Sequence, residues 1–108
     1  MKKQLLFLFM TLPTMMASAY DVIVGGIYYN LDTDNMTAEI TKGEGKQTGD
    51  IAIPETISAG GTNYTVSSIG EEAFELCKNL TSITLPGTIT SIGKYAFYQC
   101  LSLKEINK

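Results

Sequence analysis

The stretch SIGEEAFELCKNLTSI, residues Ser68–Ile83, occurs almost twice in this chain of 108 residues. The second copy, SIGKYAFYQCLSLKEI, occupies Ser91–Ile106, at a constant offset of 23 (from 68 to 91) without a gap. The identical positions are mostly apolar or Gly and the differing ones mostly polar, which is typical of a repeat with a fixed interior and a variable surface. The identical pairs are Ser68/Ser91, Ile69/Ile92, Gly70/Gly93, Ala73/Ala96, Phe74/Phe97, Cys77/Cys100, Leu80/Leu103 and Ile83/Ile106.

A partial copy precedes these two. DIAIPETI, residues 50–57, aligns with SITLPGTI, residues 82–89, at an offset of 32 (from 50 to 82). The extra residues fall in SAGGTNYTV, which is expected to form a small loop or hairpin. The sequence therefore predicts one partial leading unit, one full unit and one unit that is cut off at Lys108.

Each unit is predicted to contain a short strand and one helical turn. In LTSITLP, Ile83 and Leu85 alternate with polar residues and so lie on one side of a strand. In GEEAFELC, residues 70–77, the apolar residues have helical spacing. One unit cannot cover its own apolar face, whereas stacked units can. The predicted fold class is therefore an α+β repeat solenoid whose period equals the offset of 23 between the two full copies.

The region before the repeats is predicted to be a β-hairpin cap followed by a loop. Residues 20–41 contain two runs rich in Val, Ile and Tyr, separated by turn residues from Asp32 to Asn35. KGEGKQTGD, residues 42–50, is polar and Gly-rich and is expected to be an exposed loop. The cap and loop thus occupy residues 20–50, and the repeats occupy residues 51–108.

Residues 1–19 have the features of a signal peptide. A basic start at Lys2 and Lys3 is followed by the apolar run QLLFLFMTLPTMM and by small residues from Ala17 to Ala19. The run is too short to span a bilayer, and a buried N-terminal helix is the alternative. We expect cleavage after Ala19 and a protein that is secreted or at the cell surface.

The charged residues exclude several classes of function. Residues 20–108 contain six Lys, no Arg and eleven Asp and Glu, a net charge of −5 (6 − 11). Such a chain has no electrostatic footprint for nucleic acid or for an anionic membrane. Without any His, neither a Ser-His-Asp nor a Cys-His nucleophile system exists, and the commonest zinc ligand is missing. We predict no enzymatic activity, no cofactor and no metal.

Two groups of acidic residues are interpreted without a catalytic or metal role. The group from Asp32 to Asn35 lacks the Gly and the distal Glu of an EF-hand loop, which favours a hairpin turn. The three Glu of residues 71–75 suit general acid–base chemistry in principle. Lys94 and Tyr95 replace two of them in the second copy, which favours a solvated outer face.

The two Cys residues, Cys77 and Cys100, hold equivalent repeat positions. Neighbouring strands lie about 4.8 Å apart, whereas a disulfide needs Cβ atoms roughly 3.5–4.5 Å apart. This difference favours buried, unbridged thiols. A disulfide remains the alternative in an exported chain.

The Tyr residues suit either the core or a binding surface, where Tyr is enriched. Tyr95 and Tyr98 flank Phe97 and have the spacing of the outer side of the expected helical turn. Packing in the core or in the cap is the favoured interpretation for the Tyr residues, and a binding patch is the alternative.

The pattern SIGxxAFxxCxxLxxIxLPxxI closely resembles the BspA-like leucine-rich repeat family of bacterial surface and secreted proteins. The resemblance covers roughly residues 26–108, including the segment that leads into the repeats. It implies a leucine-rich-repeat coil stack that acts as an adhesin or binding scaffold and not as an enzyme. Typical arrays have many more units.

In such a stack the outward strand residues form one continuous face, which we take as the candidate binding face. Its expected partner is a protein or a glycan. The alternative function is structural, in which the chain caps the N-terminal end of a longer protein and its partners are further repeats. The candidate residues are Thr81, Ser82, Thr84, Lys104, Glu105 and Asn107.

Overall fold

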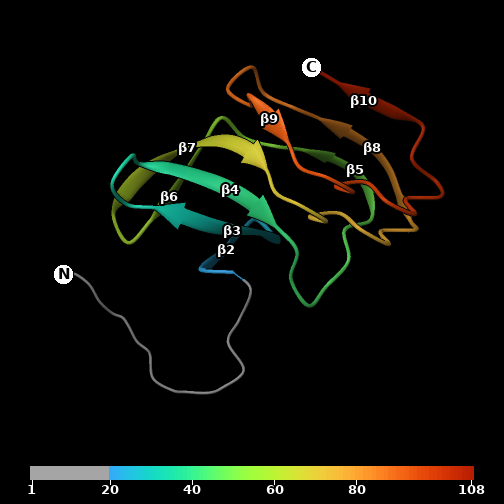
Figure 1. Cartoon of the computed structure of the whole chain (residues 1–108), viewed down its shortest axis with the longest axis horizontal. Helices are drawn as coiled ribbons and strands as arrows, with labels where there is room; N and C mark the ends of the chain where they lie inside the picture. The colour runs from blue at the N-terminus through green and yellow to red at the C-terminus, as the bar shows by residue number, and fades with distance from the viewer. Residues whose placement is uncertain (1–19) are drawn as a thin grey trace.

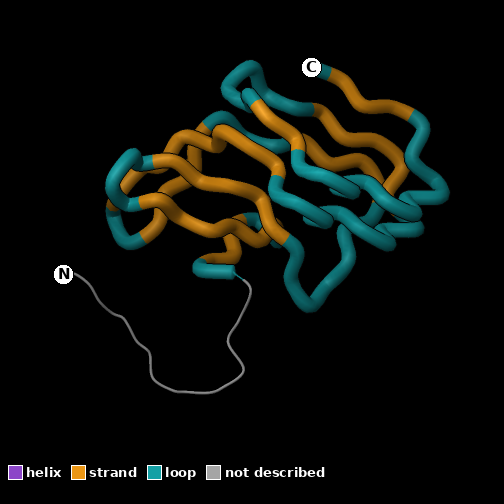
Figure 2. The backbone as a smooth tube through the Cα atoms, viewed as in Figure 1, coloured by secondary structure: helices purple, strands orange, loops and turns teal. Residues whose placement is uncertain are grey.

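The computed structural model describes residues 20–108, so the predicted signal peptide lies outside the described residues (Figure 1). The described part is built from strands and turns and contains no helix (Figure 2). The helical turn predicted for each repeat is therefore wrong, and the fold is all-β instead of α+β. Since residues 20–108 hold no helix, they contain none that is long and apolar enough to cross a membrane.

One sheet, which we call the repeat sheet, is parallel and carries the repeated sequence. It consists of β5 (Gly49–Ala52), β8 (Leu80–Thr84) and β10 (Glu105–Asn107), in the order β10-β8-β5. Ile83 lies opposite Ile106 on one side and Ile51 on the other. The numbers of these partners differ by 23 (from 83 to 106) and by 32 (from 51 to 83). The two offsets found in the sequence therefore appear as the register of the strands.

The second sheet joins the N-terminal region to the repeats. Ile69 of this sheet lies between Ile40 and Ile92, so the N-terminal strands and both repeat copies meet at one point. The strands follow the order β2 (Val22–Val24), β3 (Ile27–Asp32), β4 (Thr37–Thr41), β7 (Thr62–Ile69) and β6 (Thr56–Ala59), with β9 (Ser91–Ile92) paired to β7.

Two Gly-Gly pairs close tight hairpins in this sheet. Gly25 and Gly26 connect β2 to β3, and Gly60 and Gly61 connect β6 to β7. All four have positive φ angles, between 59° and 82°, as two-residue hairpin turns of type I′ require. The first apolar run thus forms two strands instead of one, and the insertion SAGGTNYTV contributes to the β6–β7 hairpin (Figure 1).

The segments predicted as helical turns, residues 70–77 and 93–100, form successive tight turns that lie side by side. Within the first segment, Cys77 N–H donates to Phe74 O at 3.2 Å, whereas Phe74 N–H donates to Ala96 O of the next copy at 2.8 Å. A helix would use these N–H groups within its own segment. Residues with a positive φ angle, in the left-handed region, recur at equivalent positions of the two copies, namely Glu72 and Tyr95, and Leu76 and Gln99.

The core is formed by the repeated apolar residues together with the inward-facing residues of β3 and β4. Phe74 is buried and stacks on the half-buried Phe97, with ring centroids 5.5 Å apart and planes 5° from parallel. The two copies therefore share one aromatic stack. The largest fully buried side chains are Tyr29, Phe74, Ile40, Ile69, Leu80, Ile83 and Val66.

Tyr29 carries the largest pKa shift found in residues 20–108. Its side chain is fully buried in β3, and its hydroxyl has no hydrogen-bond partner. Burial raises the pKa of Tyr29 from 10.0 to about 12. Between pH 10 and pH 12 the unfolded chain therefore releases this proton while the folded chain keeps it. The free energy of unfolding must fall as the pH rises through this window.

We predict that Tyr29→Phe removes this alkaline loss. The shift corresponds to about 2–3 kcal/mol of stability lost by pH 12. At pH 7 the variant should be at least as stable as the wild type, because it no longer buries an unpaired hydroxyl. Urea unfolding at pH 8 and pH 11 measures both effects, and Tyr98→Phe, on an exposed ring, is the control. An equal alkaline loss in Tyr29→Phe and wild type would contradict the prediction.

Candidate functional site

The outward face of the repeat sheet holds four of the six predicted binding residues in two rows. Ser82 and Thr84 lie on β8, and Glu105 and Asn107 lie opposite them on β10. The rows continue onto β5, because strand register places Asp50 opposite Ser82 and Ala52 opposite Thr84. The first row is Asp50, Ser82 and Glu105, and the second is Ala52, Thr84 and Asn107.

Thr81, a further residue of the predicted face, belongs to strand β8. The register between β5 and β8 shifts at this point, since Gly49 pairs with Leu80 but Asp50 pairs with Ser82. Thr81 is the extra residue of this β-bulge. The bulge lets two successive side chains of β8 reach the same carboxylate of β5.

Asp50 is the centre of a polar cluster on this face. Thr81 Oγ1 and Ser82 Oγ both donate to Asp50 Oδ1, at 2.7 and 2.8 Å. These bonds and the nearby positive charge of Lys104 lower the pKa of Asp50. Sequence reasoning did not select Asp50, although the offset of the partial copy aligned it with Ser82. Lys104, just before β10, is exposed with Glu105 and Asn107.

A groove of about 290 Å³ lies on the turn segments, away from the predicted face. Its lining consists of Glu72 and Glu75 from the first copy and Tyr95 and Tyr98 from the second. The Tyr rings meet edge to face with centroids 5.6 Å apart, and 55% and 49% of the two residues is exposed. Both residues therefore lie on the outer side of the turn, as their spacing indicated, and the packing in the core or cap that was favoured for the Tyr residues in general is wrong for these two.

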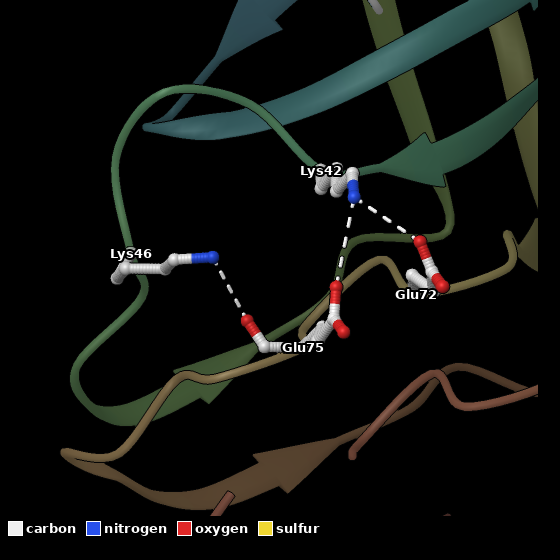
Figure 3. A network of polar contacts seen from close by, with 4 residues as sticks. All are labelled: Lys42, Lys46, Glu72 and Glu75. Carbon is white, nitrogen blue, oxygen red and sulfur yellow. Dashed lines mark hydrogen bonds and ion pairs between the residues drawn. The ribbon is translucent and has the colours of Figure 1, made fainter. Parts of the chain in front are cut away.

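The loop between β4 and β5 is fastened to this groove (Figure 3). Lys42 Nζ lies 3.1 Å from Glu72 Oε1 and 3.6 Å from Glu75 Oε1, and Lys46 Nζ donates to the backbone oxygen of Glu75 at 2.9 Å. Hydrogen bonding and charge, from Glu72 first and then Glu75, raise the pKa of Lys42. Tyr28 OH accepts a further bond from the loop backbone. The predicted exposed loop is thus held at both of its Lys residues.

The remaining candidate groups have structural roles. Cys77 is buried and Cys100 half-buried; both thiols are free, and Cys100 Sγ donates to Phe74 O at 3.0 Å. Burial raises the pKa of Cys100. The Asp32 carboxylate accepts side-chain and backbone bonds from Asn35, which lower its pKa and close the turn between β3 and β4. Residues 20–108 contain no group of three His, Cys, Asp or Glu that could hold a metal ion.

Solved structures of bacterial leucine-rich repeat proteins resemble this chain. A leucine-rich repeat protein from Bacteroides ovatus is 32% identical to this chain, with a TM-score of 0.75. The alignment covers 82% of this chain and 24% of the Bacteroides ovatus chain. A leucine-rich cell surface protein from Faecalibacterium prausnitzii is 39% identical, with a TM-score of 0.66 and coverages of 86% and 24%. One from Bacteroides capillosus is 33% identical, with a TM-score of 0.70 and coverages of 80% and 63%. The chain thus spans about a quarter of the first two structures.

A comparison with the curated proteins found no match. A comparison with protein-family models, by contrast, found one that matches the repeats. The model described as BspA type leucine rich repeat region (6 copies) matches residues 50–108, more than half of the chain. This range contains the stacked strands β5, β8 and β10, and the match confirms the resemblance inferred from the repeated motif. The chain belongs to the BspA-type leucine-rich repeat family.

Proposed function

We propose that this protein is a secreted or cell-surface binding module that recognises a protein or a glycan through the outward face of its repeat sheet. Membership of this family implies a binding role without enzymatic activity, and one similar structure is that of a cell surface protein. On this proposal the stacked strands are coils of a solenoid with the period of the repeated motif, preceded by the N-terminal strands as a cap.

The observation that carries the proposal is the pair of rows across β5, β8 and β10, in which every side chain except that of Ala52 is polar. Thr84, Lys104, Glu105 and Asn107 are exposed on strands or strand ends whose backbone is fixed by parallel pairing. A rigid sheet with variable polar side chains presents a surface without having to be ordered on binding. Further copies of the same row would add contacts and raise the avidity.

The proposal is tested by screening the protein on a glycan array and on an array of secreted and surface proteins. Each ligand found is then measured with Thr84→Arg and Asn107→Arg, two bulky changes on the face. We expect at least a tenfold loss of affinity for both. Asn63→Arg, exposed on β7 outside the repeat sheet, is the control and should leave the affinity unchanged. Equal affinity in all four proteins would contradict a role of this face.

A structural function is the alternative, in which the chain is the N-terminal cap of a longer repeat protein. Three apolar side chains near β9 and β10 support it, because Ile92, Leu101 and Ile106 are 48%, 70% and 49% exposed. Each further repeat added beyond them would bury such side chains, and stacking on a neighbour is the main source of stability in repeat proteins.

The cap function predicts that one more unit stabilises the chain. A further copy of residues 86–108 added after Lys108 should raise the melting temperature by about 5 °C or more, because each 1 kcal/mol gained is worth about 4–8 °C in a domain of this size. An added copy with Ser at its inward apolar positions is the matched control. If both extended chains melt like the original, the exposed side chains are not a stacking surface.

A further inference from the structure

The groove on the turn segments is a second surface that the proposed function does not use. We call it the aromatic groove and define it by Glu72, Glu75, Tyr95 and Tyr98. Hydrogen bonds between the copies fix its shape: Glu72 N–H donates to Lys94 O at 3.0 Å, and Leu76 N–H donates to Tyr98 O at 2.8 Å. Two carboxylates of one copy are thereby held beside two aromatic rings of the next.

The two rings are exposed in a way that suits a ligand. About half of Tyr95 and of Tyr98 is accessible to solvent, although they lie next to each other. The face of an aromatic ring attracts cations because of its quadrupole. Lys94 Nζ lies 5.2 Å from the centroid of the Tyr95 ring, so this ring already contacts an ammonium group. Lys94 is not part of the groove lining.

The carboxylate oxygens of the groove that lack a partner suit a positively charged ligand. Its lining holds two carboxylates and no basic side chain. Lys42 contacts one oxygen, Oε1, of each carboxylate, and Lys46 donates to the backbone oxygen of Glu75. Among residues 20–108, the second oxygen of each carboxylate, Oε2, has no ion-pair or hydrogen-bond partner. The net charge of −5 over residues 20–108 adds a long-range attraction for basic partners.

We propose that the aromatic groove binds a basic side chain, Arg or Lys, of a partner protein. The cation would lie over the rings of Tyr95 and Tyr98 and pair with the carboxylates of Glu72 and Glu75. It competes with Lys42 for these carboxylates. An Arg guanidinium fits best, because it stacks on aromatic rings and bonds carboxylates in two places at once. This contact goes beyond the proposed recognition by the repeat sheet and does not depend on it.

The probe is a fluorescein-labelled hexa-arginine peptide, with a citrulline hexapeptide as its uncharged isostere, measured by fluorescence anisotropy in low and in moderate salt. Glu72→Gln with Glu75→Gln should weaken binding of hexa-arginine at least tenfold. Asp34→Asn with Glu55→Gln changes the net charge equally at exposed sites outside the groove, and should weaken it less than twofold. Citrulline should bind at least tenfold more weakly than arginine.

Two further variants separate the groove from simple charge attraction. Tyr95→Ala with Tyr98→Ala leaves the charge unchanged and should weaken binding about fivefold to tenfold. Lys42→Met removes the competing cation and should strengthen it about threefold. Thermal melts establish that each variant is folded. If Tyr95→Ala with Tyr98→Ala does not fold, Tyr98→Leu alone replaces it, and the affinity for hexa-arginine should then fall about threefold.

Three results would overturn the proposal. The first is an equal loss in the two charge-matched double variants, which would show that only the net charge of the protein attracts the peptide. The second is tight binding of the citrulline peptide. The third is a neutral glycan whose binding needs the two Tyr residues but neither Glu72 nor Glu75.

Discussion

Phe74→Ala is expected to lower the free energy of unfolding by about 3–5 kcal/mol, the range for large-to-small changes at a fully buried aromatic residue. Phe74 is 2% exposed and packs in the core that both repeat copies share. Its removal leaves a cavity between the two copies. Since small domains are stable by only about 5–15 kcal/mol, this change is expected to remove much of the margin.

The repeat supplies its own control for this prediction. Phe97 is the equivalent residue in the second copy, stacks on the same ring and is only half-buried. Phe97→Ala loses the same ring–ring contact but less buried area, so we expect less than half of the effect. Urea unfolding followed by circular dichroism measures both variants. Phe74→Leu keeps the comparison measurable if Phe74→Ala does not fold. An equal or larger loss in Phe97→Ala would show that the core is placed wrongly.

The strand register was accessible from the sequence because identical apolar residues stack on one another. Ile51, Ile83 and Ile106 align at the offsets that pair them in the repeat sheet. The conformation of the segment between the strands could not be predicted from the sequence, because the spacing of Ala73, Phe74 and Cys77 suits a helix as well as successive tight turns. What decides between them is the set of bonds from one copy to the next, such as Phe74 N–H to Ala96 O.

The functional surfaces were likewise predictable from the sequence only in part. The outward rows follow from alternation along a strand, so most of the candidate face was predictable from the sequence. Asp50 was not selected because its hydroxyl partners, Thr81 and Ser82, come together only through a bulge. The aromatic groove combines Glu72 of one copy with Tyr95 of the next, at equivalent positions of the repeat. Comparison of the two copies in the sequence shows that the residue at this position varies. That the two side chains form one surface becomes visible only when the copies are stacked in the structure.

Gly93→Ala is expected to separate the two copies and to lower the free energy of unfolding by about 3 kcal/mol, the upper part of the range for overpacking. A Cβ atom added at Gly93 would lie 2.5 Å from Glu71 N, 2.7 Å from Gly70 C and 2.8 Å from Glu71 Cα. All three are backbone atoms, which cannot rotate away as a flexible side chain would. The first copy must therefore shift, and the bond from Gly93 N–H to Ile69 O, at 2.7 Å, is strained or lost.

The same reasoning accounts for the Gly in both copies of SIG. A Cβ atom added at Gly70 would lie 2.9 Å from Ile40 O, the backbone of the N-terminal strand β4. Each of these Gly residues thus lies directly against the main chain of the layer before it, and the close stacking of the layers requires a residue without a side chain.

Gly87→Ala is the matched control, because an added Cβ atom there meets nothing within 4 Å and its φ angle is not positive. It should be neutral or stabilising by about 0.4–1 kcal/mol, through a smaller entropy of the unfolded chain. Urea unfolding gives the two free energies, and hydrogen exchange at the Gly93 amide shows whether the contact between copies has opened. If Gly93→Ala is as stable as Gly87→Ala and keeps its amide protected, the copies are not packed backbone against backbone.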